Sequence, residues 1–291
     1  MLQLAGLVIV LILVGGGLAL TGGPAAMHAL PFELALIGGA ALGTVMLANS
    51  PAVAREALAG FVRAFRGARW KRADYADLFA LTGSLMRAVK RRGFVAIEAD
   101  IEMPDESAIF RAAPRILADA PARTLICDAF RLMALDLSDP QRADQRMIEA
   151  IDGHIAQRAK AVSALQTLAD ALPALGIVAA VLGIIRTMGA IDQEPAILGA
   201  MIGAALLGTF LGVFLAYGLV GPIASRYGQI VEEETVFLET IRSVIRSFGE
   251  GAAPSLAIEM ARTTLPLALQ PEAGSLTAPV TPLSAARRPA A

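Results

Sequence analysis

The chain has 291 residues and a formal net charge of −1, with 56% hydrophobic and only 18% charged residues. Soluble globular proteins carry roughly a quarter charged residues, so this composition, with a mean hydropathy of +0.61, indicates a membrane protein. The near-neutral charge gives no basic surface for nucleic acid. The chain has a single cysteine, Cys127, and therefore cannot form an intrachain disulfide. Its two histidines, His28 and His154, are too far apart in sequence to form a metal-binding motif. We interpret Cys127 as a small buried hydrophobic residue.

The first 50 residues predict a hairpin of two membrane-spanning helices. A span needs about 20 mostly apolar residues. Residues 1–32 carry no charged side chain, and residues 34–54 form a second uncharged run. We expect helices at about 2–21 and 31–50, with a loop over 22–30. The first helix is interpreted as retained rather than as a cleaved signal, because a basic n-region is missing and a second apolar run follows at once.

The next segment, residues 51–167, is polar with helical periodicity, and we expect a helical cytoplasmic domain there. Between Tyr75 and Val89, apolar residues recur at steps of three and four. Residues 149–160 form a charged helix that leads toward the next apolar segment. Since no strand pattern is convincing, the expected fold class is all-α: a polytopic membrane protein with four transmembrane helices and a helical cytoplasmic domain.

A second hairpin is predicted over residues 168–222. Residues 171–185 and 195–225 carry no charged side chain. The expected helices are at about 168–190 and 197–221.

The C-terminal part, residues 223–265, predicts cytoplasmic helices. Its apolar residues repeat over 230–248 as in an amphipathic helix that needs a partner face. Pro, Ala, Ser and Thr dominate from Gln270 on, and we expect a disordered tail over 266–291.

Basic residues predict the orientation, because they stay on the cytoplasmic side of a membrane. The loops 22–30 and 191–196 contain neither Lys nor Arg. Basic residues follow the second and fourth expected spans: Arg55, Arg63, Arg66, Arg69, Lys71 and Arg72, then Arg226. Both termini are therefore expected in the cytoplasm. Arg186 runs against this rule, and it can snorkel or pair with Asp192 or Glu194.

The expected spans hold almost no ionisable groups. No Asp, Glu or Lys lies at their centres, where the chain offers only the hydroxyls of Thr44 and Thr209, with Thr187 near an end. A proton or sodium carrier must present a titratable or coordinating group at depth. If this chain conducts ions, a partner must therefore supply the carboxylate, and a stand-alone transporter is disfavoured.

Small residues and prolines mark the second hairpin. Gly199/Gly203 and Gly208/Gly212 are GxxxG pairs, which present a smooth face to another helix, either within the chain or outside it. Pro173 and Pro222 lie at the inner ends of the two spans. Either the two prolines lie at the same level of the membrane and make a flexible ring of helix turns, or each proline only marks the end of a helix.

Three segments, in this order, resemble known signatures of the MotA family, the A subunit of the flagellar motor stator. They are residues 93–110, which resemble its cytoplasmic segment, 170–190, which resemble its third span, and 207–224, which resemble its fourth. Ala118-Asp119 also fits, and the resemblance covers about residues 1–265.

The resemblance implies a membrane complex that is not an enzyme and has no cofactor, with H⁺ as the coupling ion. A MotB-like B subunit would supply one transmembrane helix with an essential aspartate and would grip peptidoglycan. A ring of five A subunits would surround two B subunits and drive the rotor protein FliG. The alternative is an ExbB/TolQ-type energiser of an outer-membrane system, which normally has three spans and lacks the N-terminal hairpin. A purely structural scaffold would lack the paired prolines and Thr209.

The resemblance also assigns ion-path residues, because individual positions of this chain match functional positions of the family. Pro173 and Pro222 match the two prolines that couple proton transfer to movement, and Thr209 matches a hydroxyl near the ion path. Ala180 stands where sodium-driven relatives have threonine. Because a methyl group cannot coordinate dehydrated Na⁺, we predict proton coupling.

The resemblance assigns the rotor-contacting residues less uniquely than the ion-path residues. Glu98 matches the family's glutamate, and Lys90 stands at the position of its arginine, followed by Arg91 and Arg92. Lysine keeps the charge but not the bidentate guanidinium geometry, so any of the three cations can make the contact. The alternative is a solvated charged face.

Overall fold

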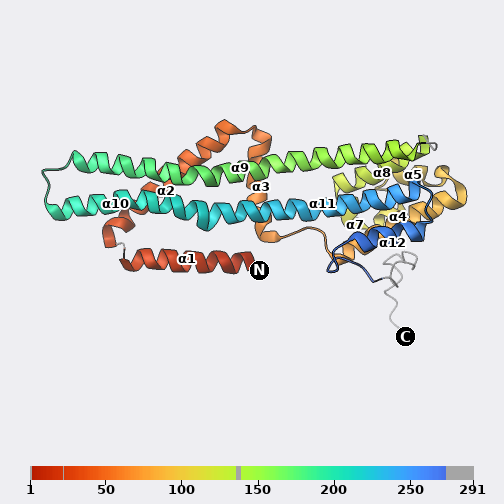
Figure 1. Cartoon of the computed structure of the whole chain (residues 1–291), viewed down its shortest axis with the longest axis horizontal. Helices are drawn as coiled ribbons and strands as arrows, with labels where there is room; N and C mark the ends of the chain where they lie inside the picture. Colours follow the sequence, from red (N-terminus) through yellow and green to blue (C-terminus); the bar gives the residue numbers. More distant parts are fainter. Residues whose placement is uncertain (1, 22, 136–138, 273–291) are drawn as a thin grey trace. The chain divides into compact units, whose positions relative to one another are not determined.

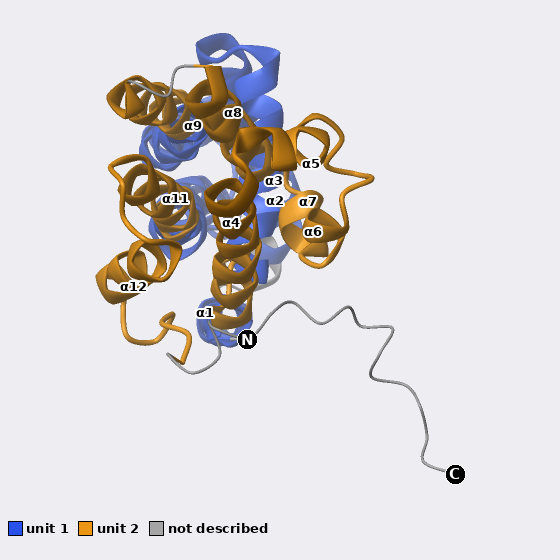
Figure 2. Cartoon of the chain, turned by 90° about the vertical axis from the view of Figure 1, so that its right-hand side faces the viewer, with its two compact units in different colours: residues 1–67, 157–231 blue, residues 68–156, 232–291 orange. Residues whose placement is uncertain are grey.

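The computed structural model describes residues 2–21, 23–135 and 139–272, and over these ranges its regular structure is entirely helical. The predicted all-α fold class is confirmed. The chain divides into two compact units (Figure 2), each built from two separate stretches of sequence. Unit 1 comprises residues 1–67 and 157–231, and unit 2 comprises residues 68–156 and 232–291.

Unit 1 contains the apolar segments of the chain, and Figure 1 labels the helices that carry them. Its helices are α1 (Leu2–Thr21), α2 (Gly23–Ala48), α3 (Pro51–Arg66), the second part of α9 (Pro140–Met188), α10 (Pro195–Val213), a π-helical segment (Phe214–Val220) and the first part of α11 (Gly221–Gly249). Within the described residues, four helices are long and apolar enough to cross a membrane. They are α1, α2, α9 and the continuous helix from α10 into α11.

The predicted loop over residues 22–30 is wrong in its described part, because α2 begins at Gly23. The sequence prediction started the second span at Pro31, a residue that usually opens or breaks a helix. Here Pro31 lies inside α2. Transmembrane helices tolerate such prolines, since neighbouring helices and local adjustments satisfy the freed carbonyl groups. The shift places Glu33 well inside the helix rather than at its edge.

A cluster of small and aromatic residues packs α3 onto α9 and α11 within unit 1. Ser50 caps α3 and Pro51 occupies its first turn. A Cβ on Gly60 would lie 2.5 Å from the ring of Tyr227, so glycine is needed for this contact. The Tyr227 hydroxyl donates a hydrogen bond of 3.0 Å to Glu56. The sequence prediction placed all of 51–167 in one cytoplasmic domain, whereas the structure groups α3 with the apolar helices.

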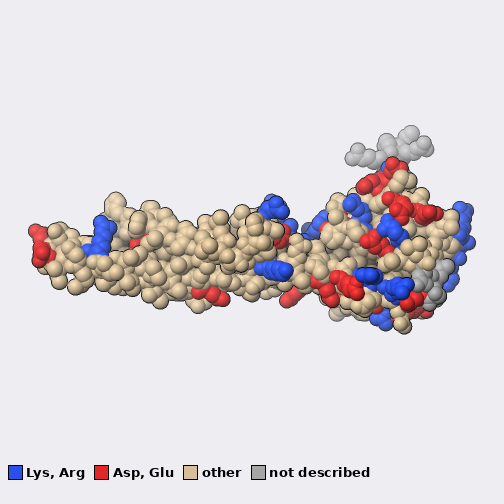
Figure 3. Space-filling model, turned by 90° about the horizontal axis from the view of Figure 1, so that it is seen from above, with Lys and Arg blue, Asp and Glu red and all other residues tan. Residues whose placement is uncertain are grey.

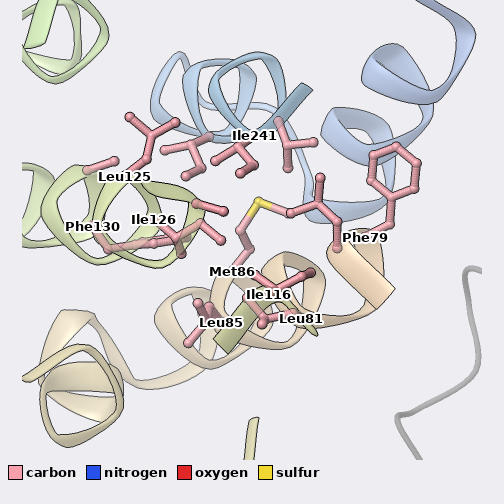
Figure 4. Close-up of a cluster of buried hydrophobic side chains, with 14 of the residues drawn as sticks. Phe79, Leu81, Leu85, Met86, Ile116, Leu125, Ile126, Phe130 and Ile241 are labelled. Carbon is pink, nitrogen blue, oxygen red and sulfur yellow. The ribbon is translucent and has the colours of Figure 1, made fainter. Parts of the chain in front are cut away.

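Unit 2 is a bundle of shorter helices with the ends of α9 and α11. Its own helices are α4 (Arg72–Arg92), a 3₁₀ turn (Phe94–Ile97), α5 (Glu98–Glu102), α6 (Ala108–Arg111), α7 (Pro114–Leu117), α8 (Ala120–Leu135) and α12 (Pro254–Thr264). Its core (Figure 4) joins α4 residues such as Phe79 and Met86 to Phe130 of α8 and Ile241 of α11. In Figure 3 charged side chains gather over this unit and are sparse over unit 1.

Residues far apart in sequence complete the core of unit 2. The Trp70 ring stacks on Phe237 at 3.9 Å, and Tyr75 meets Phe237 edge-on at 5.2 Å. This contact explains why residues 232–265 belong with unit 2 rather than forming the separate C-terminal region expected from sequence. Cys127 is buried as predicted, and burial raises the pKa of its thiol to about 11.

The predicted disordered tail falls mostly outside the described residues. Gln270 donates a 2.7 Å hydrogen bond to the carbonyl of Leu265, so the chain remains attached to the end of α12 there. Residues 273–291 lie outside the described part.

Candidate functional site

Helices α9 and α10 approach each other backbone to backbone at Gly176 and Gly212. A Cβ on Gly212 would lie 2.6 Å from the carbonyl oxygen of Leu172 and 2.8 Å from the Cα of Gly176. A Cβ on Gly176 would in turn lie 2.7 Å from the carbonyl oxygen of Gly208. These distances leave no room for a side chain, so glycine sets the spacing of the two helices.

The two GxxxG pairs of the fourth span therefore have different roles. Gly208 and Gly212 pack inside the chain, whereas a Cβ on Gly199 or Gly203 would meet nothing within 4 Å. The intrachain alternative for these motifs holds for the second pair and is wrong for the first.

Pro173 interrupts the hydrogen bonding of α9 without ending the helix. It lies inside the 49-residue helix Pro140–Met188, one residue after the Leu172 carbonyl that faces Gly212. Proline has no N–H to donate to the carbonyl four residues earlier, so this turn is weaker than its neighbours.

Pro222 occupies the comparable place on the fourth span. It is the second residue of α11, and Gly221 separates it from the π-helical segment Phe214–Val220. The amide of Gly221 bonds to the carbonyl of Ala216, five residues earlier, as expected of a π-helix. The helical path continues through both prolines, so the alternative that each marks a helix end is wrong.

Thr209 and Ala180 lie at the same stretch of the α9–α10 contact. Ala180 is 6% exposed, and its backbone nitrogen lies 3.3 Å from the position of a Cβ on Gly208, the residue before Thr209. The hydroxyls of Thr44 and Thr187 bond to carbonyls of their own helices, at 3.0 and 2.9 Å. Among the described residues the Thr209 hydroxyl makes no such bond, which leaves it available to water or a partner helix.

The sequence analysis missed Glu33 as a site residue. This carboxylate is only 6% exposed, and its Oε2 lies 3.0 Å from the position of a Cβ on Gly208. Glu33 lies near the start of the apolar stretch Met27–Ala48 rather than at its centre, and it adds a buried carboxylate to the hydroxyls that the sequence analysis named. The misplaced start of α2 concealed it.

Arg186, which opposes the charge rule, lies near the end of α9. No ion pair with Asp192 or Glu194 is found in the described part of the chain, and Arg186 instead lines a cavity together with Glu33.

The predicted rotor-contacting residues lie on one short stretch of unit 2. Lys90, Arg91 and Arg92 form the last turn of α4, where cations favour the helix dipole. Gly93, with φ at +77°, ends the helix, and Glu98 begins α5. All four charged side chains are exposed. Within the described residues none of the four forms an ion pair, although Arg91 donates a 3.4 Å hydrogen bond to the carbonyl of Arg87.

Two family models match the chain in tandem. Residues 4–93 match the motility protein A N-terminal family, and residues 117–240 match the MotA/TolQ/ExbB proton channel family. Motility protein A of Salmonella typhimurium is 36% identical over 265 residues, covering 91% of this chain and 90% of that protein. Motility protein A of Escherichia coli is 37% identical with the same coverage. The chain belongs to the motility protein A family.

Solved structures agree with this family assignment at the level of fold. A MotAB structure from C. jejuni aligns with a TM-score of 0.72 at 19% identity, over 91% of this chain and 95% of that one. The MotAB stator complex from Bacillus subtilis aligns with a TM-score of 0.66 at 21% identity, over 90% and 95%. The match of the N-terminal model to residues 4–93 distinguishes this motility protein A family chain from an ExbB/TolQ-type energiser.

Proposed function

We propose that this chain is the A subunit of a flagellar motor stator. With a MotB-like partner it forms a proton channel in the bacterial inner membrane and converts the proton motive force into torque on the rotor protein FliG. The similarity to motility protein A over 91% of the chain carries this proposal. The MotAB complexes with the same fold support a B partner and stator assembly.

The assembly would be a ring of five A subunits around two B subunits, with both termini of each A chain in the cytoplasm. The partner aspartate supplies the central carboxylate of the ion path. A proton crossing a potential of ~100 mV releases about 2.3 kcal/mol. Because the chain moves an ion and makes or breaks no covalent bond of a substrate, we assign it no enzymatic activity and no cofactor.

The coupling steps use the second hairpin. Protonation neutralises the partner aspartate and changes which face of the A ring it prefers. The close α9–α10 contact at Gly176 and Gly212 makes the two helices move together. The weakened turns at Pro173 and Pro222 would then pass this movement to unit 2, where Lys90–Arg92 and Glu98 push the rotor.

The first test asks whether protons drive swimming, as the alanine at position 180 predicts. Deleting the gene should abolish swimming, and restoring it should restore swimming that stops with a protonophore and continues when sodium is replaced by potassium. The control is a strain that carries the empty vector. Swimming that vanishes without sodium but resists the protonophore would contradict proton coupling, and normal swimming of the deletion strain would contradict the stator assignment.

Reversing the charge at Glu98 gives the second test. Glu98→Lys should reduce the swimming-ring diameter by about half or more, because loss of a charge pair at an interface costs about 1 kcal/mol or more and like charges repel. Glu106→Lys, at another exposed glutamate of the same unit, is the matched control and should swim normally. If Glu98→Lys swims as well as Glu106→Lys while both proteins are made in equal amounts, Glu98 lies outside the rotor interface.

A further inference from the structure

Glu33 is a buried carboxylate whose Oε2 meets no hydrogen-bond donor in the described part of the chain. It is the only acidic residue of α2 and is 6% exposed. Its Oε2 is fully buried and has no hydrogen-bond partner among the described residues. An ionised carboxylate without a partner is very costly to bury, so such a group holds a proton or another cation, or meets a donor from outside the chain.

A cavity of about 830 Å³ within unit 1 gives access to this region. Residues of α2, α9 and α10 line it, and their ionisable side chains are His28 and Glu33 from α2 and Arg186 from α9. Helix α10 contributes only apolar residues such as Ile197 and Met201. Because His28 and Arg186 are exposed on the surface of the chain and Glu33 is buried, the cavity extends from exposed ionisable side chains to the buried carboxylate.

The carboxylate lies against the predicted ion-path residues. A Cβ on Gly208 would be 3.0 Å from Oε2 of Glu33 and 3.3 Å from the backbone nitrogen of Ala180. The missing side chain at Gly208 therefore makes the space that the carboxylate occupies. Thr209, whose hydroxyl makes no hydrogen bond to any residue that the structure describes, is the next residue.

We propose that Glu33 is a proton-binding site of the A chain itself, which takes the coupling proton from water in this cavity before it reaches the partner's carboxylate. The proton leaves a hydronium ion, protonates one carboxylate oxygen of Glu33 and leaves a water molecule behind. Transfer to the partner aspartate through water then restores the Glu33 anion. Arg186 is the cation that faces the same cavity and stabilises that anion between transfers. This inference rests on the proposed function, since it assumes that the complex conducts protons.

Infrared spectroscopy of the purified A/B complex in lipid tests the site directly. The difference spectrum between low and high pH should contain the carbonyl stretch of a protonated carboxylic acid, part of which is lost in Glu33→Gln. Glu194→Gln, at an exposed glutamate in the turn before α10, is the matched control and should keep the wild-type spectrum. If Na⁺ at fixed pH removes the Glu33 band, the site binds a metal cation and the proton assignment is overturned.

Proton flux into vesicles that contain the complex tests whether the site is used. Glu33→Gln should lower the flux by about tenfold, as expected for an ionisable residue on an ion path, and Glu33→Asp should recover most of it. Equal amounts of assembled complex show that the variants fold. A Glu33→Gln spectrum identical to wild type, or an undiminished flux, overturns this proposal while the stator assignment stands. If wild-type swimming resists a protonophore, the proposed function fails instead, whatever the spectrum of Glu33.

Discussion

Gly212→Ala is expected to abolish swimming, because the added methyl group has nowhere to go. Its Cβ would lie 2.6 Å from the carbonyl oxygen of Leu172 and 2.8 Å from the Cα of Gly176. Both neighbours are backbone atoms, so no side-chain rotation relieves the overlap. Forcing α9 and α10 apart should destabilise unit 1 by about 3 kcal/mol. The expected readouts are loss of swimming rings and a lower thermal midpoint of the purified A/B complex in detergent.

Gly203→Ala is the matched control for Gly212→Ala. It adds the same methyl group to the same helix at a position where nothing lies within 4 Å. Alanine also has a higher helix propensity than glycine, so the change should leave the stability of the chain unchanged or slightly raised. If Gly212→Ala swims and unfolds like Gly203→Ala, the backbone contact between α9 and α10 does not control the stability of this hairpin.

Asp74→Ala is expected to destabilise unit 2 by about 2 kcal/mol, because it removes a buried acceptor from the half-exposed guanidinium of Arg115 and the backbone amide of Lys71. The Asp74 side chain is 2% exposed, and its Oδ2 accepts hydrogen bonds of 2.7 Å from Arg115 and from the backbone amide of Lys71. The same carboxylate satisfies the first turn of α4, the helix that ends in Lys90–Arg92. The thermal midpoint of the complex should fall, and swimming should be lost first at raised temperature.

Asp105→Ala is the matched control for Asp74→Ala, because it removes an exposed aspartate of the same unit. The Asp105 side chain is 79% exposed, and its ion pair with Arg123 spans 3.8 Å. Exposed pairs of this kind contribute about 0–1 kcal/mol, so the thermal midpoint should hardly change. Equal effects of Asp74→Ala and Asp105→Ala on thermal unfolding would show that the Asp74–Arg115 pair is no more important than a surface contact.

The two weakened turns of the second hairpin lie in unit 1, and the one at Pro173 is part of the α9–α10 glycine contact. The α9–α10 glycine contact belongs to unit 1, and the Asp74 pair belongs to unit 2. Helices α9 and α11 run through both units. Pro173 and the π-helical segment before Pro222 weaken the hydrogen bonding of these two helices at specific turns. At residues 156–157 and 231–232 the chain thus passes from one unit to the other inside a helix rather than in a loop.

Much of the fold could be predicted from the sequence because it depends on local properties. The absence of charges over 171–185 and 195–225 identifies apolar helices without any knowledge of their neighbours. The spacing of Leu78, Leu81 and Leu85 predicts one buried helix face, and all three side chains are buried in α4. The three long segments that resemble the MotA family were also sufficient to identify the family.

The tertiary structure alone decided which of these local features meet. Glycine spacing is identical in Gly199/Gly203 and Gly208/Gly212, yet only the second pair faces another helix of the chain. Glu33 stood at the edge of a predicted span, and its burial depends on the space left at Gly208, a residue 175 positions later. Hydropathy and periodicity describe what each helix can bury. Which atoms come within 3 Å is decided by the packing of α2, α9 and α10 together, because close packing depends on side chains from all three at once.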